Sequence, residues 1–172
     1  MKLSITIDVK ELIYDIQNKT YLTGRSRSDG NNHRQVALMQ ANDDDENLNQ
    51  IMRSISSAFA KVEAELSEVL EEKSATGSNT LSLTDDAEVI SLTMPRNFNA
   101  SATNAIASAI HQFIVASVTS EWFMITNKAD TEDYAQLSEK SLQLLRESLC
   151  RRQRPSRKTE LPTSLTTESA TD

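Results

Sequence analysis

The 172-residue chain has little cysteine, glycine, proline and histidine, and each shortage excludes a class of structure or site. Its single cysteine, Cys150, rules out an internal disulfide and a cysteine-rich zinc site, and we interpret it as an idle thiol. Only three glycines and three prolines are present, which favours long helices. Gly24, Gly30 and Gly77 stand far apart, so no glycine-rich loop is available to cradle a phosphate.

Catalytic patterns are also missing. The two histidines, His33 in a polar loop and His111 in a predicted helix, do not have metal-ligand spacing, and we interpret His111 as structural or surface. No serine lies between glycines as in a nucleophile elbow. We therefore expect no enzyme and no cofactor. A divalent-cation site at residues 43–46 remains an alternative, although consecutive carboxylates at a helix start more often stabilise the helix end.

The amino terminus does not resemble a secretory signal. Leu3, Ile5 and Ile7 alternate with polar residues instead of forming an unbroken apolar run. No later segment reaches membrane-spanning length without polar residues. We expect a soluble protein made in a cytoplasm, with no membrane partner.

Charge is unevenly distributed along the chain, whose formal net charge is −7. Residues 43–72 carry nine carboxylates against two cations, Arg53 and Lys61, whereas arginines gather near the carboxyl end. This polarity suggests a subunit that meets different neighbours at its two ends. The solvation of an exposed helix face explains the acidic segment equally well.

Local patterns predict a strand and two helices in the first half. The alternation at residues 3–7 predicts a strand. Asp8 and Glu11 resemble a capping box for a helix that ends near Gly24, and a polar loop follows at residues 23–32. After the acidic run at residues 43–46, apolar residues at helical spacing predict a helix of roughly 27 residues, about 40 Å long, reaching Lys73.

A change of period predicts a small β-hairpin near residues 79–95, with Asp85 and Asp86 at its turn. An isolated two-stranded ribbon is marginal in water, so we expect it to gain the amino-terminal strand or a strand from a neighbouring subunit. The candidates for pairing between subunits are Leu81, Leu83, Ile90, Leu92 and Met94.

Two helices joined by a short break are predicted between residues 101 and 155. The first is expected to be amphipathic, with an apolar stripe that includes Ile106, Phe113 and Ile125. Residues 127–129 interrupt it, and Asp130 is expected to cap the second helix. So short a connection predicts an antiparallel helical hairpin.

Together these patterns predict a mainly α fold: a helical bundle with a long central helix, a C-terminal helical hairpin, a small β-hairpin and extended termini. Residues 1–154 are expected to form a single domain. Residues 155–172 are rich in serine and threonine, and we expect a flexible arm that binds a partner.

The hairpin segment MPRNFNASATNAIASAIHQFIVASVTSEWFMITNKADTEDYAQLSEKSLQLLRESLCRRQRP, with the opening IDVKELIYDIQNKTYLTGRSR, resembles a known family. It is similar to the head-to-tail connector, or adaptor, proteins of tailed bacteriophages, including those of phages and prophages of gut Bacteroides-like hosts. In such adaptors a helix rich in small residues is followed by a break, a second helix and a basic arm. The long acidic helix departs from a minimal adaptor, which leaves a different neck or tail-completion ring as an alternative.

The resemblance implies a structural virion protein of the neck, made in the host bacterial cytoplasm. It implies a ring of about a dozen copies that joins the portal to the next neck or tail protein and lets double-stranded DNA pass. The arm expected to dock on the portal comprises Arg151, Arg152, Arg154, Pro155, Arg157, Lys158, Leu161 and Leu165. Acidic residues that would face the lumen and repel DNA are Glu63, Glu65, Glu68, Glu71 and Glu72.

A nucleic-acid-binding accessory protein that uses the same basic segment is the main alternative. Trp122, Phe123 and Tyr134 lie near the arginines in sequence, but we expect the aromatic side chains beside the helical turn to pack together. The basic run is short and the chain around it is acidic, unlike a dedicated DNA-binding domain.

Overall fold

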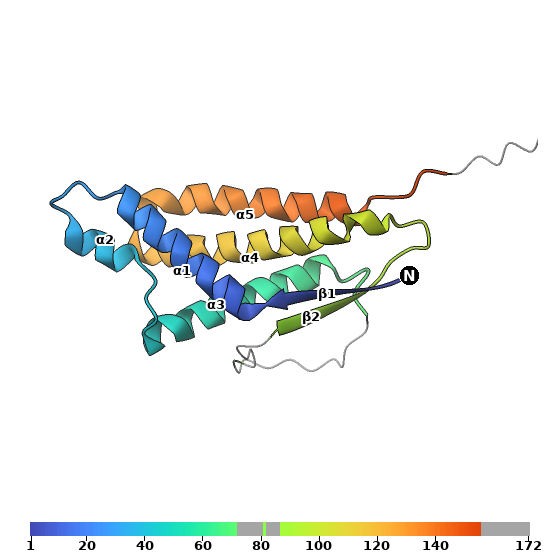
Figure 1. Ribbon diagram of the computed structural model, residues 1–172, viewed down its shortest axis with the longest axis horizontal. Helices are drawn as coiled ribbons and strands as arrows, with labels where there is room; N and C mark the ends of the chain where they lie inside the picture. The colour runs from blue at the N-terminus through green and yellow to red at the C-terminus, as the bar shows by residue number, and fades with distance from the viewer. Residues whose placement is uncertain (72–80, 82–86, 156–172) are drawn as a thin grey trace, which may run out of the picture.

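The computed structural model describes residues 1–71, 81 and 87–155. It is mainly helical with a two-stranded antiparallel element, which confirms the predicted helical bundle (Figure 1). The elements, in chain order, are β1 (Lys2–Asp8), α1 (Val9–Ser26), α2 (His33–Met39), α3 (Asp45–Glu65), β2 (Ala87–Thr93), a 3-10 turn (Ala100–Ala102), α4 (Thr103–Thr126) and α5 (Lys128–Leu149).

Helix α4 is the central helix of the bundle. Residues 113–120 are all buried, because α5 and α3 pack against α4 and α1 crosses it (Figure 1). The expected one-sided apolar stripe is therefore wrong for this half of the helix. Ile125, which the stripe included, is 74% exposed. Alanine and serine at several buried positions fit a helix that neighbours approach from more than one side.

The antiparallel hairpin of α4 and α5 is confirmed, but its cap differs from the prediction. Asn127 is the N-cap of α5, and its Oδ1 accepts a hydrogen bond from the N–H of Ala129 at 3.3 Å. Asp130, the predicted cap, lies inside the first turn and is only 3% exposed. The helix starts three residues earlier than expected, so Asp130 turns towards α1 instead of its own backbone.

The first strand and helix follow the prediction closely. Asp8 caps α1 by accepting a hydrogen bond from the N–H of Lys10 at 2.9 Å. The helix continues past Gly24, which is buried against the short helix α2 that the sequence did not predict. A Cβ atom at Gly24 would lie 3.2 Å from the carbonyl oxygen of Val36, so glycine permits the close approach of α2.

Helix α3 is shorter than predicted, with 21 residues. It ends at Glu65, and the following residues turn and run beside β2. There the N–H of Glu71 donates to the carbonyl of Ser91 at 2.9 Å, and the N–H of Thr93 donates to that of Val69 at 2.6 Å. The helical periodicity of Val69 and Leu70 was misleading, because both residues pack against the core from the turn and bridge that follow α3.

Strand β2 pairs with the amino-terminal strand, as the marginal stability of a two-stranded ribbon suggested. In this register Ile5 faces Ile90 and Leu3 faces Leu92. Ile5, Ile7, Ile90 and Leu92 join the core with α3 and α4. The first arm of the hairpin expected at residues 79–95 lies outside the described residues, apart from Leu81, which belongs to no strand.

Candidate functional site

The chain after α5 is held against the segment that precedes α4. Phe98 and Arg152 form an antiparallel bridge. The N–H of Asn99 donates to the carbonyl of Arg151 at 3.1 Å, and the N–H of Gln153 donates to that of Asn97 at 2.8 Å. Phe98 is fully buried and anchors this pairing in the core. The first residues of the predicted docking arm therefore belong to the body of the protein.

Four arginines gather at this end of the bundle. Three of them follow α5 and are exposed, as is Pro155: Arg151, Arg152 and Arg154. The fourth, Arg96, is also exposed, and it lies across from Arg154 when the register of the Phe98–Arg152 bridge is extended by two residues. Arg152 donates to the carbonyl of Leu149 at 2.7 Å and so covers the end of α5. No described carboxylate forms an ion pair with any of these four arginines. We call this cluster the basic end; it comprises Arg96, Arg151, Arg152 and Arg154. The remaining predicted arm residues, Arg157, Lys158, Leu161 and Leu165, lie outside the described residues.

The glutamates predicted to face a lumen do not form one helical row, because α3 ends at Glu65. Glu65 accepts hydrogen bonds from Arg146 of α5, one of them at 2.9 Å, and this contact holds the pKa of the Glu65 carboxyl below its usual range. Glu71 pairs with Lys2, while Glu68 is exposed. Glu63 takes part in an interaction of its own, and Glu72 lies outside the described residues.

The residues predicted to pair between subunits are largely used within the chain. Ile90 and Leu92 face Ile5 and Leu3 across the ladder. Met94 is buried and exchanges backbone hydrogen bonds with Met1 at 2.7 and 2.8 Å. Leu81 is half-buried, and Leu83 lies outside the described residues. Strand β1 thus occupies one edge of β2, and residues 69–71 border the other.

Acidic side chains gather at the opposite end of the bundle, where α3 begins beside α2 and the α4–α5 turn (Figure 1). Asp43, Asp44, Asp45 and Glu46 are exposed, and we call them the acidic end. Asp44 occupies the N-cap position of α3 without a side-chain capping bond. None of the four side chains makes a hydrogen bond or ion pair within the described part of the chain. These carboxylates therefore stabilise the start of α3 only through their negative charge.

Apolar side chains are also exposed at this same end, among them Leu38, Met124 and Ile125. Ile125 of α4 lines a narrow crevice with Gln50 and Ser54 of α3, one turn beyond Glu46, and the half-buried Trp122 borders it. Leu38 of α2 is 62% exposed and lies five residues before Asp43. The acidic end therefore combines unpaired carboxylates with uncovered apolar surface.

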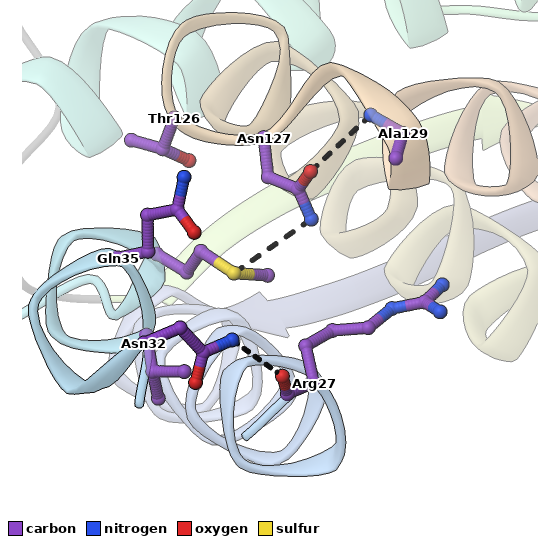
Figure 2. Close-up of a pocket in the computed structure, with 8 residues that line it drawn as sticks. Arg27, Asn32, Gln35, Thr126, Asn127 and Ala129 are labelled. Atoms are coloured by element: carbon purple, nitrogen blue, oxygen red, sulfur yellow. Dashed lines mark hydrogen bonds between the residues drawn. The ribbon is translucent and has the colours of Figure 1, made fainter. Parts of the chain in front are cut away.

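A pocket of about 220 Å³ also opens at this end, between the α1–α2 connection and the α4–α5 turn. Figure 2 shows the side chains of Arg27, Asn32, Gln35 and Asn127 around it. Arg27 donates to the buried carboxylate of Asp130, at 3.3 Å from Nε, and this hydrogen bond raises the pKa of the Arg27 guanidinium. Sequence reasoning missed this contact, because nothing local relates residues 103 positions apart.

The aromatic side chains near the α4–α5 turn are engaged in packing and hydrogen bonding. The rings of Phe123 and Tyr134 lie 5.4 Å apart at a tilted angle. Trp122 donates from Nε1 to the carbonyl of Met39 at 2.9 Å instead of packing on Tyr134. His111 contacts Asp15 of α1 at 2.8 Å, which places it at a helix contact.

Within the described ranges, no three histidine, cysteine, aspartate or glutamate side chains are arranged to hold a metal ion, and this includes residues 43–46. None of the described helices has the length and apolarity needed to cross a membrane. No family model, curated protein or solved structure matches this chain.

Proposed function

We propose that the chain is a structural, non-enzymatic subunit of a tailed-phage neck, which forms a ring that joins the capsid portal to the tail. The resemblance over residues 94–155 motivates this proposal. The observation that carries it is the fixed origin of the carboxyl-terminal arm: the chain leaves the bundle at exposed arginines, and the backbone there is hydrogen-bonded to residues 97–99. A basic segment with a fixed origin suits docking on a larger partner.

The arm that begins at Arg154 has the chemistry for such docking. Guanidinium groups form bidentate hydrogen bonds with carboxylates of the portal, and Leu161 and Leu165 supply apolar anchors. Ordering a free arm costs conformational entropy, but many linked copies in one ring bind with avidity. The anchor at Gln153 keeps the origin of each arm fixed, which limits the entropy that is lost.

Passage of double-stranded DNA through the ring calls for a lumen that repels phosphate. Of the proposed lumen residues, Glu65 and Glu71 are neutralised by Arg146 and Lys2. The repulsion would therefore depend mainly on Glu68 and on those among Glu63 and Glu72 that face the channel.

Truncation tests the docking role. A chain that ends at Arg154 keeps every helix and strand of the bundle and should show an unchanged helical circular dichroism spectrum. It should lose binding to the portal protein encoded by the same phage or prophage, measured by co-sedimentation. The matched full-length variant R157Q/K158Q/L161A/L165A keeps the arm's length but not its chemistry, and should bind as weakly. Unchanged binding by the truncated chain would reject the arm as the docking element.

A second candidate function is nucleic-acid binding by the basic end, which is favoured by arginines that lack carboxylate partners among the described residues. It predicts duplex affinity that falls steeply with salt, and a salt slope reduced by about 3 units in R96Q/R151Q/R154Q. The control K10Q/R53Q/K140Q removes the same charge from other exposed positions. No binding at low salt would reject this function.

A further inference from the structure

The two ends of the bundle carry unsatisfied charge of opposite sign. Asp43, Asp45 and Glu46 at one end are exposed and unpaired within the described residues. Arg96, Arg151 and Arg154 are likewise exposed and unpaired at the other. Elsewhere on the surface, opposite charges from different elements do pair, as Lys61 with Glu121 and Arg146 with Glu65. Other exposed charges without a described partner lie beside charges of the opposite sign, as Lys10 beside Glu11 and Lys140 beside Glu139, whereas each of the two named ends carries a cluster of one sign.

These ends cannot meet within one molecule. Helix α4 has 24 residues and spans about 36 Å, and it runs from the basic end to the acidic end (Figure 1). The described arginines are held near the start of α4 by the backbone bonds to residues 97–99. Any ion pair between the two ends must therefore join two copies of the chain.

We propose that the acidic end of one copy binds the basic end of a second copy. This inference rests on the proposed ring, and it identifies the contact between neighbouring copies in that ring. Carboxylates and guanidinium groups provide complementary potentials that orient the two copies. Ile125 and Leu38 are exposed at the same end of the bundle and supply apolar area that excludes water from the contact.

Electrostatics also fixes the type of contact. Two acidic ends repel each other, and so do two basic ends, so a contact made from one end of each copy is head-to-tail. A head-to-tail contact uses two different surfaces of each subunit, and it generates a closed ring when the rotation between copies closes. The arm beyond Pro155 is not needed for this contact, which leaves it available to the portal.

Complementation between two variants tests the contact. D43N/D45N/E46Q neutralises the acidic end and keeps Asp44 at the N-cap of α3, while R96Q/R151Q/R154Q neutralises the basic end. In low-salt sedimentation, wild type should form species that grow with concentration beyond a dimer, and its self-association should weaken about tenfold in moderate salt. Each variant alone should remain monomeric. An equimolar mixture should form heterodimers, because each variant retains the end that the other lacks.

Matched controls separate this contact from a general effect of charge. E11Q/E68Q/E139Q and K10Q/R53Q/K140Q change exposed residues outside the two ends and should associate like wild type. A wild-type monomer at low salt, or a mixture that stays monomeric, would overturn the proposal. Wild-type protein that forms dimers and no larger species would also overturn it. In an antiparallel dimer both ends of each copy are already paired, so no end is left to extend a ring. Portal binding is measured separately, so either proposal can fail without the other.

Discussion

The hydroxyl groups of Thr23 and Tyr134 lie 2.8 Å apart, so the last turns of α1 are hydrogen-bonded to the beginning of α5. One turn further along the chain from Thr23, Arg27 contacts Asp130, and about two turns earlier Asp15 contacts His111 of α4. These polar contacts follow one flank of α1 at helical spacing. They orient α1 across the α4–α5 hairpin. Apolar packing alone would define the crossing angle and register of α1 less specifically.

The Arg27–Asp130 contact should be asymmetric in its contribution to stability. Replacing Arg27 with glutamine leaves a buried carboxylate whose remaining side-chain partner is the amide of Asn127, and an underpaired buried charge is costly. Replacing Asp130 with asparagine leaves an arginine that water can hydrate. At neutral pH, R27Q should therefore lose more free energy of unfolding than D130N in urea titrations. K128Q, at an exposed neighbouring position, serves as the control, and an equal or larger loss in D130N would contradict this account.

The Glu65–Arg146 contact should make stability depend on pH. The hydrogen bond from Arg146 lowers the pKa of Glu65 from 4.5, so the folded protein favours the ionised carboxylate. Its contribution is present above the unfolded pKa and is lost as the pH falls through the lowered, folded pKa. The stability advantage of wild type over E65Q should therefore be largest near neutral pH and shrink in acid. Thermal unfolding across this range measures it, and a gap that widens in acid would refute it.

The control for this pH dependence is E68Q. Glu68 is exposed, and no ion pair or hydrogen bond engages its side chain among the described residues. Its replacement should change stability only slightly at neutral pH, because no described ion pair or hydrogen bond is lost. A pH-dependent effect equal to that of E65Q would assign the behaviour to overall charge.

Phe98 should hold both the core and the start of the carboxyl-terminal segment. Its side chain is fully buried, so Phe98→Ala should cost about 3–5 kcal/mol of unfolding free energy in urea titrations. The amide protons of Asn99 and Gln153 should exchange faster, because they pair the two segments that Phe98 anchors. Met124→Ala, at an exposed position, should cost about 0.5 kcal/mol or less. Unchanged exchange at Gln153 would show that the segment is held without this anchor.

Gly24 should tolerate no branched side chain. A Cβ atom there meets the backbone oxygen of Val36 at 3.2 Å, and backbone cannot rotate away as a flexible side chain does. Gly24→Val should therefore displace α2 and cost about 1–3 kcal/mol in thermal or urea unfolding. Arg25→Val makes a comparable change at the next, exposed position of the same helix. Similar stability of the two variants would show that α2 does not need this close approach.

Local sequence patterns predicted most helices and the first strand, but not all of their limits. The alternation of Leu3, Ile5 and Ile7 predicts β1, and Asp8 predicts the start of α1. Helix α2 was missed because its seven residues follow a polar loop and show too few turns for a periodic pattern. The end of α3 was placed too late, because Val69 and Leu70 continue the helical spacing while lying beside β2.

The candidate site was predictable only in its composition. The arginines after α5 and the carboxylates at residues 43–46 are evident in the sequence. That they lie at opposite ends of one bundle, unpaired by other described residues, depends on the directions of α3, α4 and α5. The contact of Arg27 with Asp130 had no local signal.

The sequence by itself determined that α1, α3, α4 and α5 are helical, where β1 and α1 begin, and where each sign of charge gathers, because these properties depend on residues close together along the chain. Only the tertiary structure decided that β2 pairs with the amino terminus, that α4 is enclosed and that Asp130 faces Arg27. Such choices are made between residues far apart in sequence, and they depend on which packing buries the most apolar surface while pairing the polar groups it encloses.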